Sequence, residues 1–534
     1  MKKILGVLVS ALYWCLLAQA ATAQDYRILY NFAGSPADDS PQPFGNFAQN
    51  GDMLYGATER GGTAAKGTIF SIKTDGSNYT TLHNFTGSPD GISPYGSPIL
   101  IGNKLYGTTN SGGSHGAPPN GDGILFSFDL QTSTLAKLHD FGASATDGVG
   151  SSGRLLLQQN IFYGITGSGG TKDKGTIFSY DLGSSTYAKR YDFQGVPDGA
   201  SPAAGLISDG TLFYGTTRDG GVNGGVPGFG TIFTFNPATS AYSKIYDFTG
   251  SPDSGESPEG ELLLHDGRLY GATGEGGAGW AGANYDGTVY SLKTDGTDFR
   301  ILHSFVSSPY DGALPSGGLI LNGSALYGLT YFGGHPGWVS GAYGYGVIYS
   351  IGTDGSDFSI LHAFAGPLGD GSNPGDKLLL SGNTLYGATL SGGNTGIGDG
   401  FGTIFSYSFP TPTPTPTPLI TLHVNKTTFS TTDQITVTAD VSKTATAFYP
   451  FIRLTHPNGT SLYYVRGKGF SSAKRSFLQS GPFVLRNAIH SYPIINVSFA
   501  RIQAGTYVLE GWGADVFGEV IDFADRHNLA VHAP

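Results

Sequence analysis

Hydrophobic positions in this chain recur in short alternating runs, a pattern that predicts β-strands. A tripeptide ending in Tyr-Gly returns every 51 to 59 residues, and each copy is followed by a run resembling Gly-Thr-Ile-Phe. A third run ends in phenylalanine, and a fourth is a plain apolar stretch such as 98–101. The Tyr-Gly tyrosines are Tyr55, Tyr106, Tyr163, Tyr214, Tyr270, Tyr327 and Tyr386. Seven units of four short strands predict a seven-bladed β-propeller.

The ends of the repeat region predict how the ring closes. We name the strands of one unit A (apolar), B (Tyr-Gly), C (Gly-Thr-Ile-Phe) and D (ending in Phe). Asp-Gly pairs between strands C and D, as at Asp75-Gly76, favour hairpins and therefore antiparallel neighbours. The region begins with a lone strand D at 26–32 and ends with a strand C at 402–407. We expect the N-terminal strand to complete the last blade; the alternative is an open solenoid with both partial units unpaired.

These repeated strings resemble a known family. Leu-Tyr-Gly-x-Thr, a Gly-Gly pair, Gly-Thr-Ile-Phe-Ser, Thr-Asp-Gly and Leu-His-x-Phe are similar to the Gloeo/Verruco (GloVer) tandem repeat of secreted bacterial proteins, over about residues 26–409. The period and the paired glycines also resemble kelch blades. The resemblance implies an exported, surface-associated protein and brings no catalytic residues with it.

The N-terminus and the composition narrow the class of protein. Residues 1–23 have a basic start, an apolar run and small residues before a cut after Ala23, as in a secretory signal peptide; the alternative is a buried N-terminal helix. The only cysteine, Cys15, lies inside this segment, which leaves the mature chain without a disulfide. Without Lys2 and Lys3 the chain has 27 basic and 40 acidic residues, which disfavours nucleic acid as a partner. We expect a secreted or cell-surface protein with no transmembrane anchor once the signal is removed.

A second domain is predicted after the propeller, which spans 24–409. Residues 410–418 alternate proline and threonine and predict an extended linker. Residues 419–534 contain strand-like runs at 434–441, 447–454 and 506–511, for which we expect an immunoglobulin-like β-sandwich. The propeller holds 17 basic and 33 acidic residues, a net charge of −16, and the second domain is at +3. A basic cluster in the second domain is either a solvated loop or a contact for an acidic partner.

Two series of polar residues repeat with the blades. An aspartate follows each strand D and a histidine or tyrosine stands two residues before its last phenylalanine. The aspartates are Asp38, Asp90, Asp147, Asp198, Asp253, Asp311 and Asp370, and the histidines are His83, His139, His303 and His362. A ring of carboxylates could bind calcium, but glycine and proline after most of them favour a turn-forming role. Tyrosine at three of the histidine positions favours packing over metal binding. No metal site and no cofactor are therefore predicted.

The loops between strands B and C differ most between blades, and those of blades 5 and 6 concentrate large aromatic residues. The predicted ligand-binding residues are Trp280, Tyr285, Tyr331, Trp338, Tyr343 and Tyr345. Exposed rings in such loops suit stacking on a sugar or gripping a partner protein, and the alternative is that they pack between the two blades. We expect a binding or adhesion protein whose partner is an extracellular glycan or a surface protein. The alternatives are a structural surface protein and a glycan-cleaving enzyme that uses Glu275 and Asp286 as acid and base.

Overall fold

The computed structural model describes residues 25–409 apart from 33–42, 44–46, 117–120, 251, 253, 278–286, 307–310, 335–343, 367–368 and 394–399. Beyond residue 409 it describes only strands, without their side chains. The chain divides into two compact units, Met1–Pro410 and Thr411–Pro534. The predicted signal peptide and the linker lie outside the described residues. No helix in the described part of the chain is long and apolar enough to cross a membrane.

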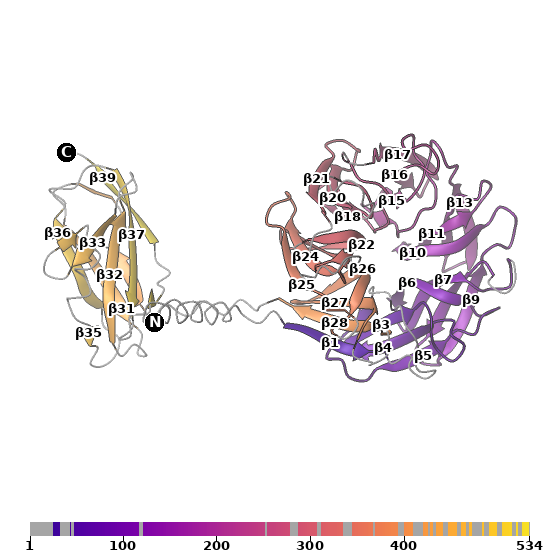
Figure 1. The fold of residues 1–534 in the computed structure, drawn as a ribbon, viewed down its shortest axis with the longest axis horizontal. Helices are drawn as coiled ribbons and strands as arrows, with labels where there is room; N and C mark the ends of the chain where they lie inside the picture. Colours follow the sequence, from indigo (N-terminus) through magenta and orange to yellow (C-terminus); the bar gives the residue numbers. More distant parts are fainter. Residues whose placement is uncertain are drawn as a thin grey trace, which may run out of the picture. The chain divides into compact units, whose positions relative to one another are not determined.

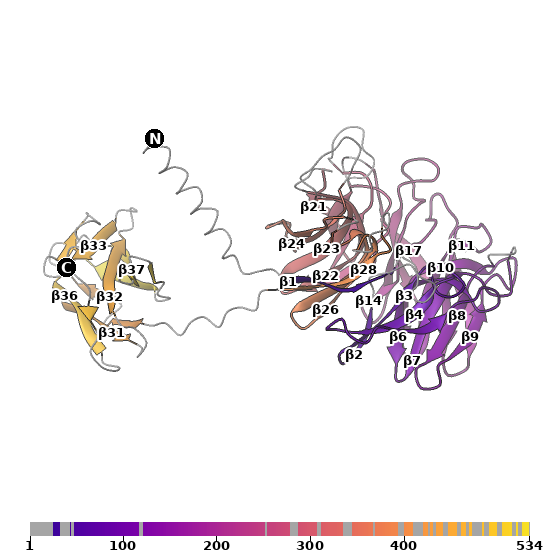
Figure 2. The same cartoon turned by 60° about the horizontal axis from the view of Figure 1, so that its bottom comes forward.

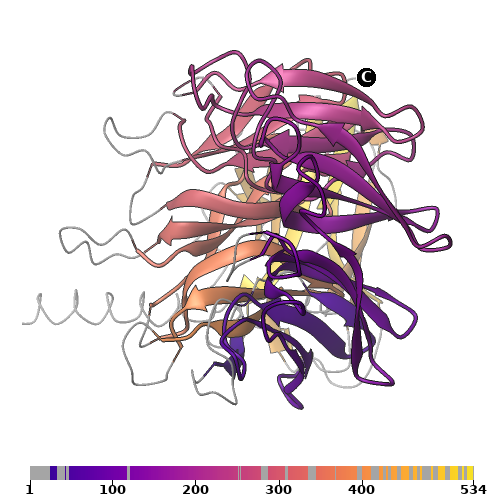
Figure 3. The same ribbon diagram turned by 90° about the vertical axis from the view of Figure 1, so that its right-hand side faces the viewer.

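The first unit is a seven-bladed β-propeller, as the sequence predicts. Seven four-stranded antiparallel sheets surround one axis (Figure 1). Seen from the side, the sheets of successive blades lie face to face (Figure 3). The strands A of neighbouring blades contact one another around the axis, so that strand A is the innermost strand of each blade.

The strands follow in the order A, B, C, D within blades I to VI. Blades I to III contain β2 (Ala48–Asn50), β3 (Met53–Thr58), β4 (Thr68–Lys73), β5 (Thr80–Asn84); β6 (Ile92–Ile101), β7 (Lys104–Ser111), β8 (Ile124–Asp129), β9 (Thr134–Asp140); and β10 (Gly148–Gln158), β11 (Ile161–Gly169), β12 (Thr176–Asp181), β13 (Thr186–Asp192). Blades IV to VI contain β14 (Ile207–Ser208), β15 (Phe213–Thr217), β16 (Thr231–Asn236), β17 (Ala241–Asp247); β18 (Leu263–His265), β19 (Arg268–Thr273), β20 (Thr288–Lys293), β21 (Arg300–Ser304); and β22 (Gly312–Asn322), β23 (Ala325–Gly333), β24 (Val347–Gly352), β25 (Ser359–Ala363).

Blade VII closes the ring with strands from both ends of the repeat region. It contains β26 (Ser372–Ser381), β27 (Thr384–Ser391), β28 (Thr403–Ser408) and the N-terminal strand β1 (Asp25–Asn31). β1 runs antiparallel to β28 with Tyr26 opposite Tyr407, and β1 is labelled beside this blade in Figure 2. The predicted closure is confirmed, and the open solenoid is excluded. Both ends of the propeller are therefore held in one sheet, which leaves no unpaired strand C at the seam.

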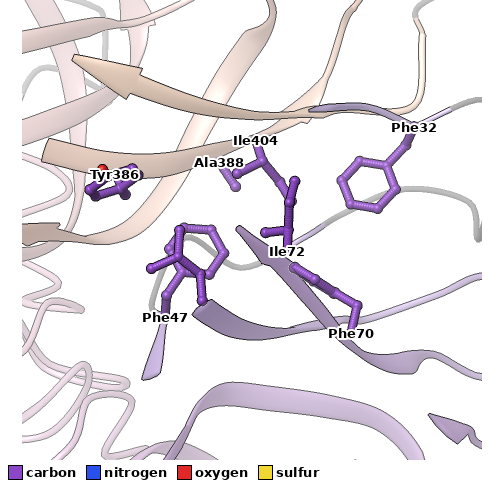
Figure 4. Close-up of a cluster of buried hydrophobic side chains, with 8 residues drawn as sticks. Phe32, Phe47, Phe70, Ile72, Tyr386, Ala388 and Ile404 are labelled. Carbon is purple, nitrogen blue, oxygen red and sulfur yellow. The ribbon is translucent and has the colours of Figure 1, made fainter. Parts of the chain in front are cut away.

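Hydrophobic side chains fill the space between neighbouring blades. At the closing seam, Phe32 follows β1 and packs in one buried cluster with Phe70 and Ile72 of β4 and with Ile404 of β28 (Figure 4). Corresponding buried clusters lie at the other blade boundaries. Strand C is buried on both faces, as in the pattern of Thr68–Lys73, because it lies between two such clusters. The propeller is thus held by a ring of apolar interfaces.

The repeated Tyr-Gly has a steric cause. Strand B lies beside strand C, and a Cβ atom on Gly56 would overlap the ring of Phe70. The same relation holds in the other six blades between the glycine of strand B and the aromatic residue of strand C. Glycine in strand B therefore makes room for the aromatic ring that fills the blade interface.

The second unit is also built of strands. β29 (Ile420–Val424), β31 (Gln434–Val441) and β36 (Ser491–Ser498) form one sheet. A second sheet has the order β30 (Thr428–Ser430), β39 (Arg526–His532), β37 (Gly505–Ala514), β32 (Ala447–Thr455), β33 (Ser461–Val465), β34 (Gly469–Ser471), with β35 (Phe483–Val484) beside β32 and β38 (Val520–Ile521) beside β37. The three strand-like runs of the sequence are thus found in β31, β32 and β37.

Candidate functional site

Two of the six predicted ligand-binding residues lie in the described part of the chain. Tyr331 ends strand B of blade VI, and Tyr345 precedes strand C of the same blade. Asn373 of blade VII holds both: its side-chain amide donates to the Tyr331 carbonyl (3.1 Å) and its backbone N–H donates to the Tyr345 carbonyl (2.8 Å). Trp280, Tyr285, Trp338 and Tyr343 lie outside the described residues, as does Asp286. Their role stays a prediction.

The two described tyrosines have different surroundings. Tyr345 packs against the buried cluster between blades VI and VII, and a Cβ atom on Gly366 would overlap its ring. Tyr331 is half-buried, and its ring meets that of Phe332 edge to face at 4.7 Å. Burial raises the pKa of Tyr331. Tyr331 also lines a cavity at the centre of the propeller. Of the two predicted ligand-binding residues that the structure describes, Tyr331 is the one that lines this cavity.

This central cavity has a volume of about 180 Å³ and is enclosed mainly by the strands A and the loops that lead into them. Its wall combines aromatic, charged and small residues. The residues with side chains of interest are Tyr95, Arg154, Glu259, Glu261, Ser316, Tyr331 and Asp376. A second cavity of about 400 Å³ shares Tyr95 and Ala203 with it and extends over blades II to IV past Asn110 and Arg218. The two cavities adjoin at Tyr95 and Ala203, which line both.

Glycine backbones bring the innermost strands close together at the cavity. A Cβ atom on Gly317 would overlap the backbone of Asp376 in the next blade, and one on Gly260 would overlap the carbonyl oxygen of Gly317. Gly317 also has a φ of +71°, which favours glycine. Close approach of these backbones narrows the centre of the ring, so that a ligand would be held by the cavity wall and not in an open channel.

An ion pair crosses blade VI at the cavity wall. Lys377 Nζ of blade VII lies 2.9 Å from Glu261 Oε2 of blade V. Gly318 of blade VI lies between them, and a Cβ atom there would crowd the lysine chain and the glutamate. Arg154 of blade III is exposed in the same cavity wall.

Several carboxyl groups near the cavity have raised pKa values. The walls around Glu259 desolvate its carboxyl group and raise its pKa, and Arg218, at 3.8 Å, offsets only part of this effect. Glu256 and Glu275 pair through their backbones, with N–H to carbonyl distances of 2.9 and 3.2 Å. Burial raises the pKa of both carboxyl groups. Burial and the nearby Asp376 and Glu259 raise the pKa of Tyr95.

The repeated aspartates and histidines form one recurring contact, which we call the aspartate clasp: the Asp after strand D bound to the His or Tyr of that strand. Asp147 accepts hydrogen bonds from His139 Nε2 (3.1 Å), the Tyr187 hydroxyl (2.7 Å) and the Gly148 N–H (2.8 Å). In blade III the Tyr191 hydroxyl donates to Asp198 at 2.8 Å. The other clasps among the described residues are His83–Asp90, His303–Asp311 and His362–Asp370.

The clasp explains why histidine and tyrosine exchange at this position. Each donates one hydrogen bond to the carboxylate and offers a flat ring to the next blade. His139 stacks on Tyr187 at 3.5 Å between centroids, and Tyr191 stacks on Tyr242 at 4.3 Å. Among the described residues no three His, Cys, Asp or Glu side chains are arranged to hold a metal ion. The geometry gives these aspartates and histidines a structural role at the loop from strand D to strand A.

Sequence reasoning missed most of the cavity wall. Tyr95, Arg154, Glu259, Glu261 and Lys377 come from strands A and the loops before them. The signal was present as differences between the copies, since equivalent positions of these segments hold arginine, glutamate, lysine, serine or glycine.

The fold and the cavity define a seven-bladed propeller with a polar, tyrosine-lined centre. The chain belongs to the Gloeobacter/Verrucomicrobia repeat family, whose model matches residues 18–226, 222–337 and 280–473. This confirms the family resemblance seen in the sequence. A search of curated proteins finds no match.

Solved structures with a similar fold are distant. An oligogalacturonate lyase from Vibrio parahaemolyticus is 12% identical, with 73% of this chain and 95% of that chain covered and a TM-score of 0.45. A GH74 enzyme from Niastella koreensis is 14% identical (82% and 64% covered, TM-score 0.42). An extracellular domain assigned to a one component system of B. thetaiotaomicron is 10% identical (94% and 54% covered, TM-score 0.46), so this chain spans about half the length of that domain. Likeness at this level carries no information about activity.

Proposed function

We propose that this protein is an exported, surface-associated binding protein that takes an extracellular saccharide at the centre of its propeller. The observation that carries the proposal is the central cavity, where the rings of Tyr95 and Tyr331 stand beside carboxylate, guanidinium and hydroxyl groups. Aromatic rings beside several polar groups suit a sugar, because a sugar ring has apolar faces and a rim of hydroxyl groups. Trp280 and Trp338 are proposed as further ligand-binding residues, as the sequence predicts.

A glycan array probed with the mature protein tests the proposal, followed by titration of the best saccharide. Tyr331→Ala removes the ring and should weaken binding about fivefold, since a stacking contact contributes on the order of 1 kcal/mol. Tyr331→Phe keeps the ring and serves as the matched control. Trp280→Ala and Trp338→Ala test the loops separately. An array with no bound saccharide, or equal affinity of Tyr331→Ala and Tyr331→Phe, would contradict a site at the cavity.

A second candidate function is glycan cleavage, favoured by the adjacent Glu256 and Glu275. Their backbones are paired, and both carboxyl groups have raised pKa values, as a general acid requires. Release of reducing ends from a bound saccharide, lost in Glu275→Gln, would support an enzyme. Binding without any cleavage over days would leave the binding function alone.

We further propose that the second unit is an immunoglobulin-like sandwich and that residues 1–23 are a signal peptide. The two sheets of the second unit support the immunoglobulin-like assignment. N-terminal sequencing of the protein recovered from outside the cytoplasm should begin at Gln24. An experimental structure of residues 419–534 should show the two sheets packed face to face, and a different packing would remove the immunoglobulin-like assignment.

A further inference from the structure

We propose that the saccharide carries a carboxylate group and that Arg154 is the residue that receives it. This inference rests on the proposed saccharide-binding function. It starts from the arrangement of charges on the innermost strands, at one position of strand A and its approach that holds serine, arginine, glutamate, lysine and, in two blades, glycine. The residues at this position are Ser97, Arg154, Gly205, Glu261, Gly318 and Lys377.

Glu261 has a cation two blades away on each side. Lys377 lies beyond Gly318 in one direction, and Arg154 lies beyond Gly205 in the other. The glycines leave the intervening blades without side chains at this position, so that the charged residues share the space in front of them. The Glu261 carboxylate forms an ion pair with Lys377 at 2.9 Å, which neutralises its charge.

Arg154 is left as the free cation of the wall. It lines the central cavity and is exposed, and its guanidinium makes no hydrogen bond or ion pair with any described residue. Arg154 thus brings a positive charge to the wall of a domain that holds 17 basic and 33 acidic residues. A guanidinium group presents two parallel N–H donors, a geometry that matches a carboxylate.

Two carboxylates of the cavity wall each have a cation nearby. Glu261 is neutralised by Lys377, and Glu259 lies 3.8 Å from Arg218. The Asp376 carboxylate accepts the backbone N–H of Lys377 at 2.9 Å. Tyr95 and Tyr331 line the same cavity as Arg154. The cavity thus offers an aromatic surface and one unpaired guanidinium, which together fit a sugar with a carboxylate at its rim, that is, a uronic acid.

The test compares acidic and neutral sugars of the same shape. Trimannuronate and trigalacturonate are titrated into the full mature chain beside mannotriose and galactotriose of the same linkage, at low and high salt. We expect the acidic sugars to bind more tightly and to lose affinity at high salt, because salt screens the charge contact. Arg154→Gln should weaken their binding about tenfold, the effect of losing one charge-assisted hydrogen-bond pair.

Arg154→Lys and Arg300→Gln are the controls. Arg154→Lys keeps the charge without the paired donors and should retain part of the affinity. Arg300 lies on the outer strand of blade V, where it pairs with Asp298, and Arg300→Gln should not change binding. Equal binding of acidic and neutral sugars, or unchanged affinity in Arg154→Gln, would overturn the inference and leave the saccharide function standing. Absence of binding to every saccharide would overturn both.

Discussion

Strand D and strand A form opposite edges of each blade. The residues near strand D recur from copy to copy, whereas those near strand A vary. At strand D the same aspartate clasp recurs in blade after blade, with histidine or tyrosine as the donor. At strand A the positions around the cavity hold arginine, glutamate, lysine, serine or glycine. A residue at the clasp binds strand D to the loop that follows it, and the five clasps among the described residues share this arrangement. A residue at the cavity faces a space lined by blades II to VII, so each of these copies can contribute a different group.

The largest expected effect concerns the glycines that bring the strands A together. Gly317→Ala should lower the free energy of unfolding by about 3 kcal/mol or more, because the new Cβ meets the backbone of Asp376 in addition to the strain of a positive φ. Gly267 has the same φ of +71° with nothing within 4 Å of a Cβ atom. Gly267→Ala should therefore cost only about 1 kcal/mol. Urea unfolding measures both, and equal costs would show that the centre is loosely packed.

A smaller effect is expected at the clasp. Asp147→Asn replaces the acceptor for His139 and Tyr187 with a neutral amide and should lower the free energy of unfolding by about 2 kcal/mol. Asp266→Asn is the matched control, since the Asp266 side chain is 87% exposed and its only ion pair is with His265. Thermal unfolding should separate the two variants. A clasp variant as stable as the control would mean that the repetition of the clasp has no stabilising role.

The clasp also predicts how stability depends on pH. Burial raises the pKa of Asp147, but the hydrogen bonds from His139, Tyr187 and Gly148 outweigh it and hold the pKa below its usual value. A carboxylate with a lowered pKa in the folded state stabilises the fold above its unfolded pKa, near 3.9, and loses this effect as pH falls to the folded pKa. We expect the free energy of unfolding to decrease from about pH 4 downward. The decrease should be smaller in Asp147→Asn, and an identical decrease in both proteins would remove Asp147 as a cause.

The same contrast explains what the sequence could predict. Blade number followed from residues such as Tyr55 that recur in every copy, and ring closure followed from the strand count at the two ends, where Phe32 ends a lone strand D. The pairing of His139 with Asp147 was missed, although both series had been noticed, because seven residues separate them in the sequence and only the fold brings them together. The cavity wall was missed for a different reason. Arg154 and Glu261 stand out only when the copies are compared for their differences, and which of them share a space depends on the order of blades around the axis.

The smallest effect on stability is expected at the ion pair of Lys377 and Glu261. This effect tests whether the charged residues of the innermost strands act together. Lys377→Met removes the partner of Glu261. We expect Arg154, which lines the same cavity, to take over the pairing, so that the change costs less than about 1 kcal/mol. The double variant Lys377→Met/Arg154→Gln leaves Glu261 with no cation and should cost clearly more than the two single changes added together.

Lys377→Met should also weaken binding of trimannuronate, since Arg154 would then be engaged by Glu261. Adding Glu261→Gln to Lys377→Met should restore that binding, because Arg154 becomes free again. If the losses in the free energy of unfolding are additive and trimannuronate binding is not restored, each of these charged residues acts alone. Strand A and strand D would then differ only in which residues they contain.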